Sequence, residues 1–262
     1  MTAKWFRRFG PAHESGQLRL YCFHYAGGSA ASFRDWRPLL PPYVEVVAVQ
    51  LPGRENRFRE QPFREMRPLA EAVADAMAAE LTLPYAFFGF SMGARVALAV
   101  AHVLRKRDLR LPAQLFCASS SAPSRGLPVR GWNESDERLI AYLRELGGTP
   151  AEVFDSPELL EMYLPIVRAD LTVIGTCPPR SGVPLAVPLR AFAGADDTQA
   201  PPEDVRDWGR ETSAAFALTV LSGGHFFDPA GRTEMIRQIG ADLALRVPNS
   251  AISYRPESAY RA

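Results

Sequence analysis

The feature that most constrains the fold is an alternation of short apolar segments with longer segments of helical periodicity. Glycine and proline bound the apolar segments, and several are apolar almost throughout, which is typical of strands covered by helices on both faces. The strands that we expect are residues 18–23, 44–51, 85–90, 114–119, 189–193 and 216–221. The alternation predicts an α/β fold with a mostly parallel sheet.

Apolar residues recur every four positions in two of the intervening segments, which we interpret as the core faces of helices. These residues are Leu69, Val73, Met77 and Leu81, and then Val96, Val100 and Leu104.

Residues 125–183 break the alternation, because they contain helical patterns and no convincing strand. Thr149-Pro150-Ala151-Glu152 has the spacing of a capping box with proline at the first helical position, and Ser156-Pro157 predicts a second helix start. An insertion of this kind is usually a lid over a site, although it could be a layer that only thickens the fold. The first 16 and last 15 or so residues resemble tails.

A chain of 262 residues that is 47% apolar and 23% charged can bury enough surface for one stable domain, and we expect a single domain over residues 1–262. Its 30 basic and 29 acidic residues nearly cancel. This balance excludes disorder and argues against a global affinity for nucleic acid or for an anionic membrane, while a local patch stays open.

Cys22, Cys117 and Cys177 are an odd number without metal-like spacing, and two of them fall in apolar segments. We interpret them as buried free thiols in a reducing compartment. Residues 1–10 are not followed by the apolar stretch of a secretory signal, and no segment reaches the roughly 18 apolar residues that span a bilayer. We therefore expect a cytoplasmic protein.

Gly89-Phe90-Ser91-Met92-Gly93 is a G-x-S-x-G pentapeptide between an expected strand and an expected helix, the setting that a nucleophile elbow requires. The elbow strains the serine backbone, so the positions two before and two after must lack side chains, as Gly89 and Gly93 do. We interpret Ser91 as a nucleophile. The alternative is an ordinary strand-to-helix turn in which the serine caps the helix.

A serine hydroxyl is a weak nucleophile that needs a base and a group to orient the base. In this fold the acid and then the histidine follow the serine along the chain. His13 lies in the N-terminal tail, His102 lies within a helix and His24 precedes the serine, whereas His225 follows the last expected strand. His225 is our candidate base, and a structural loop histidine is the alternative.

The candidate acid lies in Gly194-Ala195-Asp196-Asp197, directly after the expected strand 189–193. Both aspartates are plausible from spacing alone. We select Asp197, because carboxylates in this setting usually stand three residues after the glycine, and we assign Asp196 to the turn. The acid would accept a hydrogen bond from one imidazole nitrogen and leave the other free to take the serine proton.

Acyl transfer also needs hydrogen-bond donors for the oxyanion that develops during the reaction. The motif predicts one donor, the backbone N–H of Met92. We expect the second donor, the Ala26 N–H, in the loop His24-Tyr25-Ala26-Gly27-Gly28-Ser29, whose glycines let the backbone approach a substrate carbonyl. The alternative for this loop is a plain glycine turn that leads into a helix.

Several segments taken together can be compared with a known family. They are Phe23-His24-Tyr25-Ala26-Gly27-Gly28-Ser29, Pro52-Gly53-Arg54-Glu55-Asn56-Arg57, Gly89-Phe90-Ser91-Met92-Gly93, Leu146-Gly147-Gly148-Thr149-Pro150, Leu164-Pro165-Ile166-Val167-Arg168-Ala169-Asp170 and Gly223-Gly224-His225-Phe226-Phe227. This combination resembles the type II thioesterases, which are stand-alone α/β-hydrolase enzymes that serve polyketide synthases and non-ribosomal peptide synthetases in antibiotic biosynthesis. The resemblance covers about residues 5–245.

The resemblance implies an α/β-hydrolase fold and hydrolysis of acyl thioesters on the 4′-phosphopantetheine arm of carrier proteins, which removes aberrant or stalled acyl groups. It also assigns the nucleophile to Ser91, the acid to Asp197 and the base to His225. No metal or dissociable cofactor is required, because the phosphopantetheine belongs to the partner. We expect acyl or peptidyl carrier proteins as partners, no nucleic acid or membrane, and a monomer.

The sequence departs from the family at two places. Phe90 precedes the nucleophile where the family commonly has histidine, and we expect altered packing there rather than lost chemistry. Residues 171–179 lack the acidic and aromatic residues of that part of the lid, which leaves the acyl-chain preference open.

Arg54 has two interpretations. Arginine suits phosphate geometry and could clamp the pantetheine arm. We prefer a structural role, in which Arg54 pairs with an acidic neighbour at a strand end, and we leave it out of the site.

Other functions use the same residues. A small-molecule carboxylesterase or lipase, or an acyltransferase, would have the same triad, since water and other nucleophiles can accept the acyl group. A non-catalytic module that only docks carrier proteins would lack an activated serine.

Overall fold

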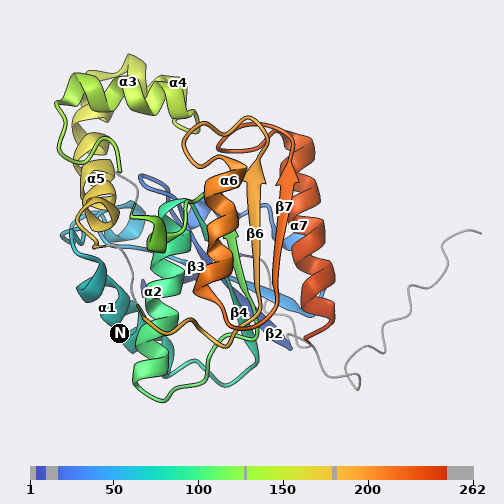
Figure 1. Ribbon diagram of the computed structural model, residues 1–262. Helices are drawn as coiled ribbons and strands as arrows, with labels where there is room; N and C mark the ends of the chain where they lie inside the picture. Colours follow the sequence, from blue (N-terminus) through green and yellow to red (C-terminus); the bar gives the residue numbers. More distant parts are fainter. Residues whose placement is uncertain (1–3, 10–16, 127–128, 179–181, 247–262) are drawn as a thin grey trace, which may run out of the picture.

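Seven strands form one sheet in the computed structural model, which describes residues 4–9, 17–126, 129–178 and 182–246 (Figure 1). The strands are β1 (Phe6–Arg8), β2 (Leu18–Phe23), β3 (Val44–Val49), β4 (Tyr85–Phe90), β5 (Leu115–Ala118), β6 (Leu189–Gly194) and β7 (Phe216–Leu221). Their order across the sheet is β1-β3-β2-β4-β5-β6-β7, and every neighbouring pair is parallel except β1 and β3. The six predicted strands and the mostly parallel sheet are confirmed.

The prediction that the first 16 residues form a tail is wrong for β1. Phe6 pairs with Val49 in the antiparallel register of β1 and β3, and its side chain is buried in the core. The Trp5 carbonyl accepts a 2.8 Å hydrogen bond from Gln50 N–H. The N-terminal segment is therefore part of the sheet edge.

Helices cover both faces of the sheet, which explains why β4 and β5 are buried along their whole length. On one face lie α1 (Met66–Ala78), α2 (Met92–Lys106), the short α6 (Pro202–Val205) and the 3₁₀ helix η6 (Arg206–Glu211). The other face is covered by α7 (Pro229–Ala244) and the 3₁₀ segments η2 (Ala30–Phe33) and η3 (Arg37–Leu39). Two further 3₁₀ turns are η4 (Glu55–Arg57) and η5 (Pro123–Arg125).

Both predicted apolar stripes lie on helices of the first face. The side chains of Leu69, Val73 and Met77 on α1 are buried, whereas Leu81 lies beyond the end of that helix. The second stripe is buried on α2.

Residues 125–183, which we call the lid segment, contribute α3 (Asp136–Leu146), α4 (Ala151–Asp155) and α5 (Pro157–Gly175) and no strand among their described residues. Figure 1 shows α3 and α4 standing beyond the end of the sheet, with α5 leading back toward α1 and α2. Ser156 caps α5 as predicted, because its hydroxyl accepts a 3.3 Å hydrogen bond from Leu159 N–H.

The predicted capping box at Thr149 is wrong. Pro150 occupies the N-cap position of α4, and no side chain caps that helix. The Thr149 hydroxyl instead forms a 3.4 Å hydrogen bond with the Tyr163 hydroxyl of α5. A tertiary contact has replaced the local one.

The three cysteines are free thiols: Cys22 and Cys117 are buried and Cys177 is partly exposed. Burial raises the pKa of all three thiols. Within the described ranges, none of the helices combines the length and hydropathy that crossing a membrane requires.

Candidate active site

The turn between β4 and α2 holds Ser91 in a strained conformation, with φ of 54° and ψ of −116°. A Cβ atom on Gly89 would lie 2.4 Å from Ala94 Cα, and one on Gly93 would lie 2.2 Å from the Phe23 carbonyl oxygen. Both glycines are therefore required by backbone contacts, as the elbow interpretation predicts. The Ser91 side chain makes no helix-capping hydrogen bond, which removes the interpretation of Ser91 as a plain cap.

Ser91, His225 and Asp197 come together at the carboxyl ends of β4, β7 and β6. The Ser91 Oγ lies 3.0 Å from His225 Nε2, and His225 Nδ1 lies 2.9 Å from Asp197 Oδ2. Residues far apart in the sequence meet here because the carboxyl ends of parallel strands lie at the same edge of the sheet. One imidazole thus connects the hydroxyl to a carboxylate, an arrangement that can remove the hydroxyl proton.

The Asp197 side chain is fully buried, whereas Asp196 is exposed. Burial alone raises the pKa of the Asp197 carboxyl. The hydrogen bond and charge of His225, with the N–H groups of Ala200 and Gln199, reverse this and hold the pKa below its usual value. Those two N–H groups donate to Asp197 Oδ1 at 3.0 and 2.9 Å, so the Oδ2 atom is left for the imidazole.

His24 lies beside the β4–α2 elbow, but its ring bonds elsewhere. His24 is buried, and its Nδ1 donates a 2.8 Å hydrogen bond to the Tyr25 carbonyl, since a carbonyl oxygen can only accept. Burial, with a smaller effect from the charge of Arg54, lowers the pKa of His24 to about 4, so its ring is neutral at pH 7. His102 lies on α2, and His13 lies outside the described residues.

The two predicted oxyanion donors lie in turns beside Ser91. Met92 begins α2, so its N–H has no intrahelical acceptor. Residues 25–28 form a turn in which Gly28 N–H donates to the Tyr25 carbonyl at 3.0 Å. Within the described part of the chain, neither the Met92 nor the Ala26 N–H donates to another residue.

Phe90 packs in an aromatic cluster next to the histidine. Its ring stacks on Phe226 at a centroid distance of 5.4 Å and an interplanar angle of 17°, and the His225 ring lies edge-on at 6.0 Å. Tyr25 and Phe227 also contact Phe90. The aromatic residue thus fills space beside the imidazole and leaves both ring nitrogens to their polar partners.

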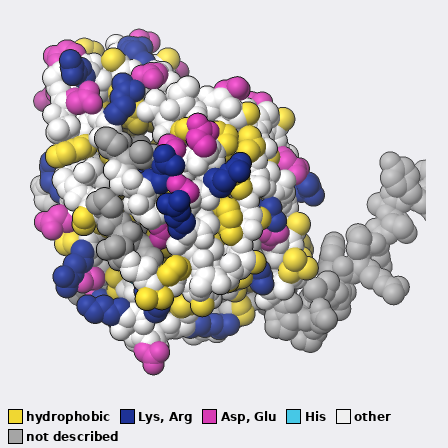
Figure 2. Space-filling view, viewed as in Figure 1, with side chains coloured by type: hydrophobic (Ala, Val, Ile, Leu, Met, Phe, Trp, Pro, Cys, Tyr) yellow, Lys and Arg dark blue, Asp and Glu magenta, His cyan; other side chains and the backbone are white. Residues whose placement is uncertain are grey.

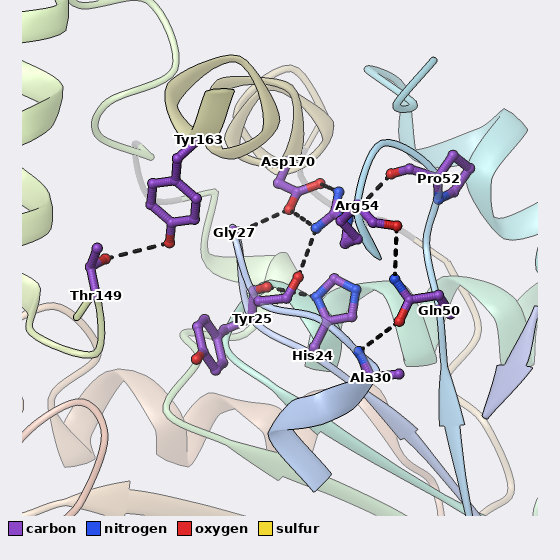
Figure 3. A network of polar contacts seen from close by, with 11 residues as sticks. His24, Tyr25, Gly27, Ala30, Gln50, Pro52, Arg54, Thr149, Tyr163 and Asp170 are labelled. Carbon is purple, nitrogen blue, oxygen red and sulfur yellow. Dashed lines mark hydrogen bonds and ion pairs between the residues drawn. The ribbon is translucent and has the colours of Figure 1, made fainter. Parts of the chain in front are cut away.

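Arg54 is buried and donates to Asp170 on α5 through two nitrogens, at 2.6 and 2.8 Å (Figure 3). It also donates to the Gly28 carbonyl at 3.0 Å and to the Pro52 carbonyl at 3.2 Å. The structural interpretation of Arg54 is supported, but its partner is 116 residues away on a helix rather than at a strand end. Asp170 was not predicted as this partner, because only its place in a family-like segment marked it.

A cavity of about 720 Å³ lies between α1, α2 and the end of α5. Its walls include Ala70, Leu98, Ala99 and Ile174, and its lining residue nearest to Ser91 along α2 is Arg95. Among its lining residues are none of the triad and neither of the two proposed oxyanion donors.

A parallel sheet whose carboxyl edge carries this serine, histidine and aspartate, with the serine in a strained strand-to-helix turn, belongs to the α/β-hydrolase class of enzymes. The Thioesterase domain family matches residues 18–243, and the chain belongs to that family. It is a thioester hydrolase.

Similar proteins agree in fold and in sequence. The gramicidin S biosynthesis protein GrsT of Aneurinibacillus migulanus is 33% identical over 243 residues, which are 92% of this chain and 94% of GrsT. The thioesterase RedJ from the prodiginine pathway of Streptomyces coelicolor is 40% identical, with a TM-score of 0.83 over 88% of this chain and 92% of RedJ. The type II thioesterase BorB from the borrelidin cluster is 35% identical, with a TM-score of 0.82 over 91% of this chain and 97% of BorB.

Proposed function

We propose that this enzyme hydrolyses acyl thioesters carried on the phosphopantetheine arm of acyl or peptidyl carrier proteins, and that it edits a polyketide or non-ribosomal peptide assembly line. The observation that carries the proposal is the hydrogen-bonded series Ser91–His225–Asp197 in a chain of the Thioesterase domain family. The similarity to BorB, a type II thioesterase from a biosynthetic cluster, supports the assembly-line context.

In the proposed reaction, Ser91 Oγ attacks the thioester carbonyl while His225 Nε2 takes the hydroxyl proton. Asp197 accepts the hydrogen bond from His225 Nδ1 and stabilises the imidazolium that forms. The tetrahedral intermediate collapses, His225 returns the proton to the departing pantetheine thiolate, and an acyl-serine remains. His225 then activates a water molecule that releases the free acid. The reaction needs no cofactor of the enzyme.

The developing oxyanion is stabilised by the N–H groups of Met92 and Ala26 in this mechanism. Both groups are free of other acceptors among the described residues, so neither must break a hydrogen bond when substrate arrives. Preorganised donors of this kind are the larger part of catalysis in acyl transfer.

We infer that the lid segment covers the acyl chain. The cavity of about 720 Å³ beneath the end of α5 is lined by none of the triad residues or proposed oxyanion donors, so we do not assign the acyl chain to it. The departure of residues 171–179 from the family pattern leaves the preferred acyl chain open.

The distribution of charge on the surface affects how a carrier protein would be recruited. On the face that Figure 2 shows, Lys and Arg side chains are interspersed with Asp and Glu side chains, over the lid helices as well as over the sheet. Because the net charge is only +1, an acidic carrier protein meets no strong overall field. We infer that docking depends on a local patch near the lid, where Leu159 and Met162 of α5 are exposed.

The test is thioester hydrolysis with a panel of acyl chains on carrier protein, with Ser91→Ala beside the wild type. We expect hydrolysis by the wild type and a loss of about 10⁶-fold in kcat in the variant, because the nucleophile is gone. An enzyme that is fast only on simple aryl esters would overturn the thioesterase assignment of the site in favour of an esterase. A wild-type Ser91 that a fluorophosphonate does not label would indicate a docking module without catalysis.

A further inference from the structure

The helix α5 rests directly on loop 24–29, which carries the proposed oxyanion donor Ala26 (Figure 3). Asp170 Oδ2 on α5 accepts a 2.8 Å hydrogen bond from Gly27 N–H. A Cβ atom on Gly27, whose φ is 76°, would lie 2.4 Å from the Tyr163 hydroxyl oxygen and 2.7 Å from Val167 Cγ2. Tyr163 and Val167 therefore pack closely against Gly27, and Asp170 accepts a hydrogen bond from its N–H.

Arg54 completes this contact from the opposite direction. Its two terminal nitrogens bind both carboxylate oxygens of Asp170, and Nη1 also donates to the Gly28 carbonyl. The two side chains are only 5% and 4% exposed. The ion pair thus holds the N–H of Gly27 and the carbonyl of Gly28 at once, in a region from which water is largely excluded.

The orientation of the Ala26 N–H follows from the hydrogen bonds of its own peptide unit. In a trans peptide the N–H points opposite to the preceding carbonyl. The Tyr25 carbonyl is fixed by two donors, Gly28 N–H at 3.0 Å and His24 Nδ1 at 2.8 Å. The positive φ at Gly27 matches the third position of a type II turn, in which the next peptide is also set. Holding Gly27 and Gly28 therefore fixes where the Ala26 N–H points.

We propose that Asp170 and Arg54 are positioning residues of the reaction, which clamp loop 24–29 to the lid helix α5 and so aim the Ala26 N–H at the oxyanion. The proposal rests on the proposed function, because it takes the Ala26 N–H to be an oxyanion donor. Neither residue touches the substrate; each acts through the loop.

The alternative is that the pair only stabilises the fold, and two variants separate the possibilities. Asp170→Asn keeps the shape of the side chain but removes the charge, and it leaves Arg54 as a buried cation without its counterion. The double variant Arg54→Met/Asp170→Leu removes both charges and fills the space with apolar atoms, which often restores stability. It leaves Gly27 N–H without its acceptor.

A matched control exists on the same helix. Arg168, two residues before Asp170, pairs with Asp136 of α3. Asp136→Asn removes a lid ion pair that does not reach loop 24–29. We expect this variant to keep the wild-type kcat.

The experiment measures kcat, KM and Tm of the three variants with acyl carrier protein. For Asp170→Asn we expect kcat to fall about 10-fold or more, with KM changed by less than about threefold, because a displaced donor weakens the transition state and not substrate binding. The double variant should regain Tm while its kcat stays low. A double variant that regains kcat together with Tm would overturn the clamp, and so would a folded Asp170→Asn with wild-type kcat.

Fluorophosphonate labelling of Ser91 keeps this test separate from the proposed substrate. The phosphoryl oxygen occupies the oxyanion position, and no carrier protein is involved. If wild-type enzyme is labelled but does not hydrolyse acyl carrier protein, the proposed function fails, while a slower labelling rate of Asp170→Asn and of the double variant still supports the clamp. Equal labelling rates in wild type and both variants would overturn the clamp alone.

Discussion

Asp196 and Asp197 are adjacent in the sequence and differ in almost every physical property that matters for catalysis. Asp197 is buried, accepts hydrogen bonds from two backbone N–H groups and from His225, and has a lowered pKa. Asp196 is exposed in the turn after β6. Spacing alone left both aspartates plausible, and Asp197 was selected because the acid in this setting usually stands three residues after the glycine. The structure places the Asp197 carboxylate against His225.

This difference predicts a large loss of activity for one conservative substitution and almost no change for the other. Asp197→Asn should lower kcat by about 10⁴-fold, because an amide favours the wrong imidazole tautomer and cannot stabilise the imidazolium. Asp196→Asn is the matched control and should leave kcat within about twofold of wild type. Steady-state hydrolysis of an acyl thioester measures both, and a comparable loss in the two variants would contradict the assignment of the acid.

The residues of the site differ in how far the sequence alone could identify them. Ser91 and His225 were found from local motifs and chain order, and the structure brings both together with Asp197. Asp170 could not be found in this way, because its contacts to Gly27 and Arg54 span 143 and 116 residues. Contacts between segments so far apart in the sequence depend on how the whole chain packs, so no local sequence pattern predicts them.

At the scale of elements, the β4–α2 elbow is a junction that backbone contacts constrain tightly. A Cβ atom on Gly93 would collide with the backbone of Phe23 and His24 on the neighbouring strand end. Backbone atoms in a parallel sheet cannot move aside as a flexible side chain can. The elbow is therefore fixed both by its own turn and by β2.

Gly93→Ala should destabilise the protein by more than about 3 kcal/mol or prevent it from folding. Gly224→Ala is the control, since its Cβ would meet only the Asp196 carbonyl oxygen, at 3.8 Å. Denaturant unfolding monitored by circular dichroism measures the free energy of unfolding of both variants. A Gly93→Ala protein as stable as Gly224→Ala would show that the elbow can relax.

Some strands and helix starts could be predicted from the sequence and others could not. Strands β2 to β6 were visible because burial on both faces makes them apolar along most of their length. The edge strand β7 is mostly only partly buried, and it was visible because its residues are nevertheless largely apolar. Strand β1 has three residues, of which only Phe6 is buried, so its sequence carries almost no pattern and its structure depends on pairing with β3. The capping box at Thr149 failed because the hydroxyl bonds to Tyr163, on another helix.

At the scale of the whole molecule, burial of the neutral His24 links folding to pH. The pKa of His24 is about 4 in the folded protein, against an ordinary value of 6.5. Between these values the unfolded chain binds the proton and the folded protein does not, so stability falls as the pH drops from about 6.5 to 4.

The loss expected from this one group approaches about 3 kcal/mol at the acid end of the window. His24→Gln should flatten the dependence of unfolding free energy on pH by about one proton, whatever its effect on stability at pH 7. Denaturant titrations at pH steps from 7 to 4.5 measure the slope. Identical slopes in wild type and variant would show that His24 is already protonated in the folded state.

The lid segment leaves the sheet after β5 and returns at β6, and these two strands are direct neighbours. In protein engineering terms it is a cassette: a shorter or longer lid from another enzyme could be spliced in without altering the strand register. The Asp170–Arg54 contact sets the condition for such an exchange. A transplanted lid without a carboxylate at this position would leave Arg54 buried without a counterion. Lids for such an exchange should therefore first be required to have that carboxylate, and only then be compared by acyl preference.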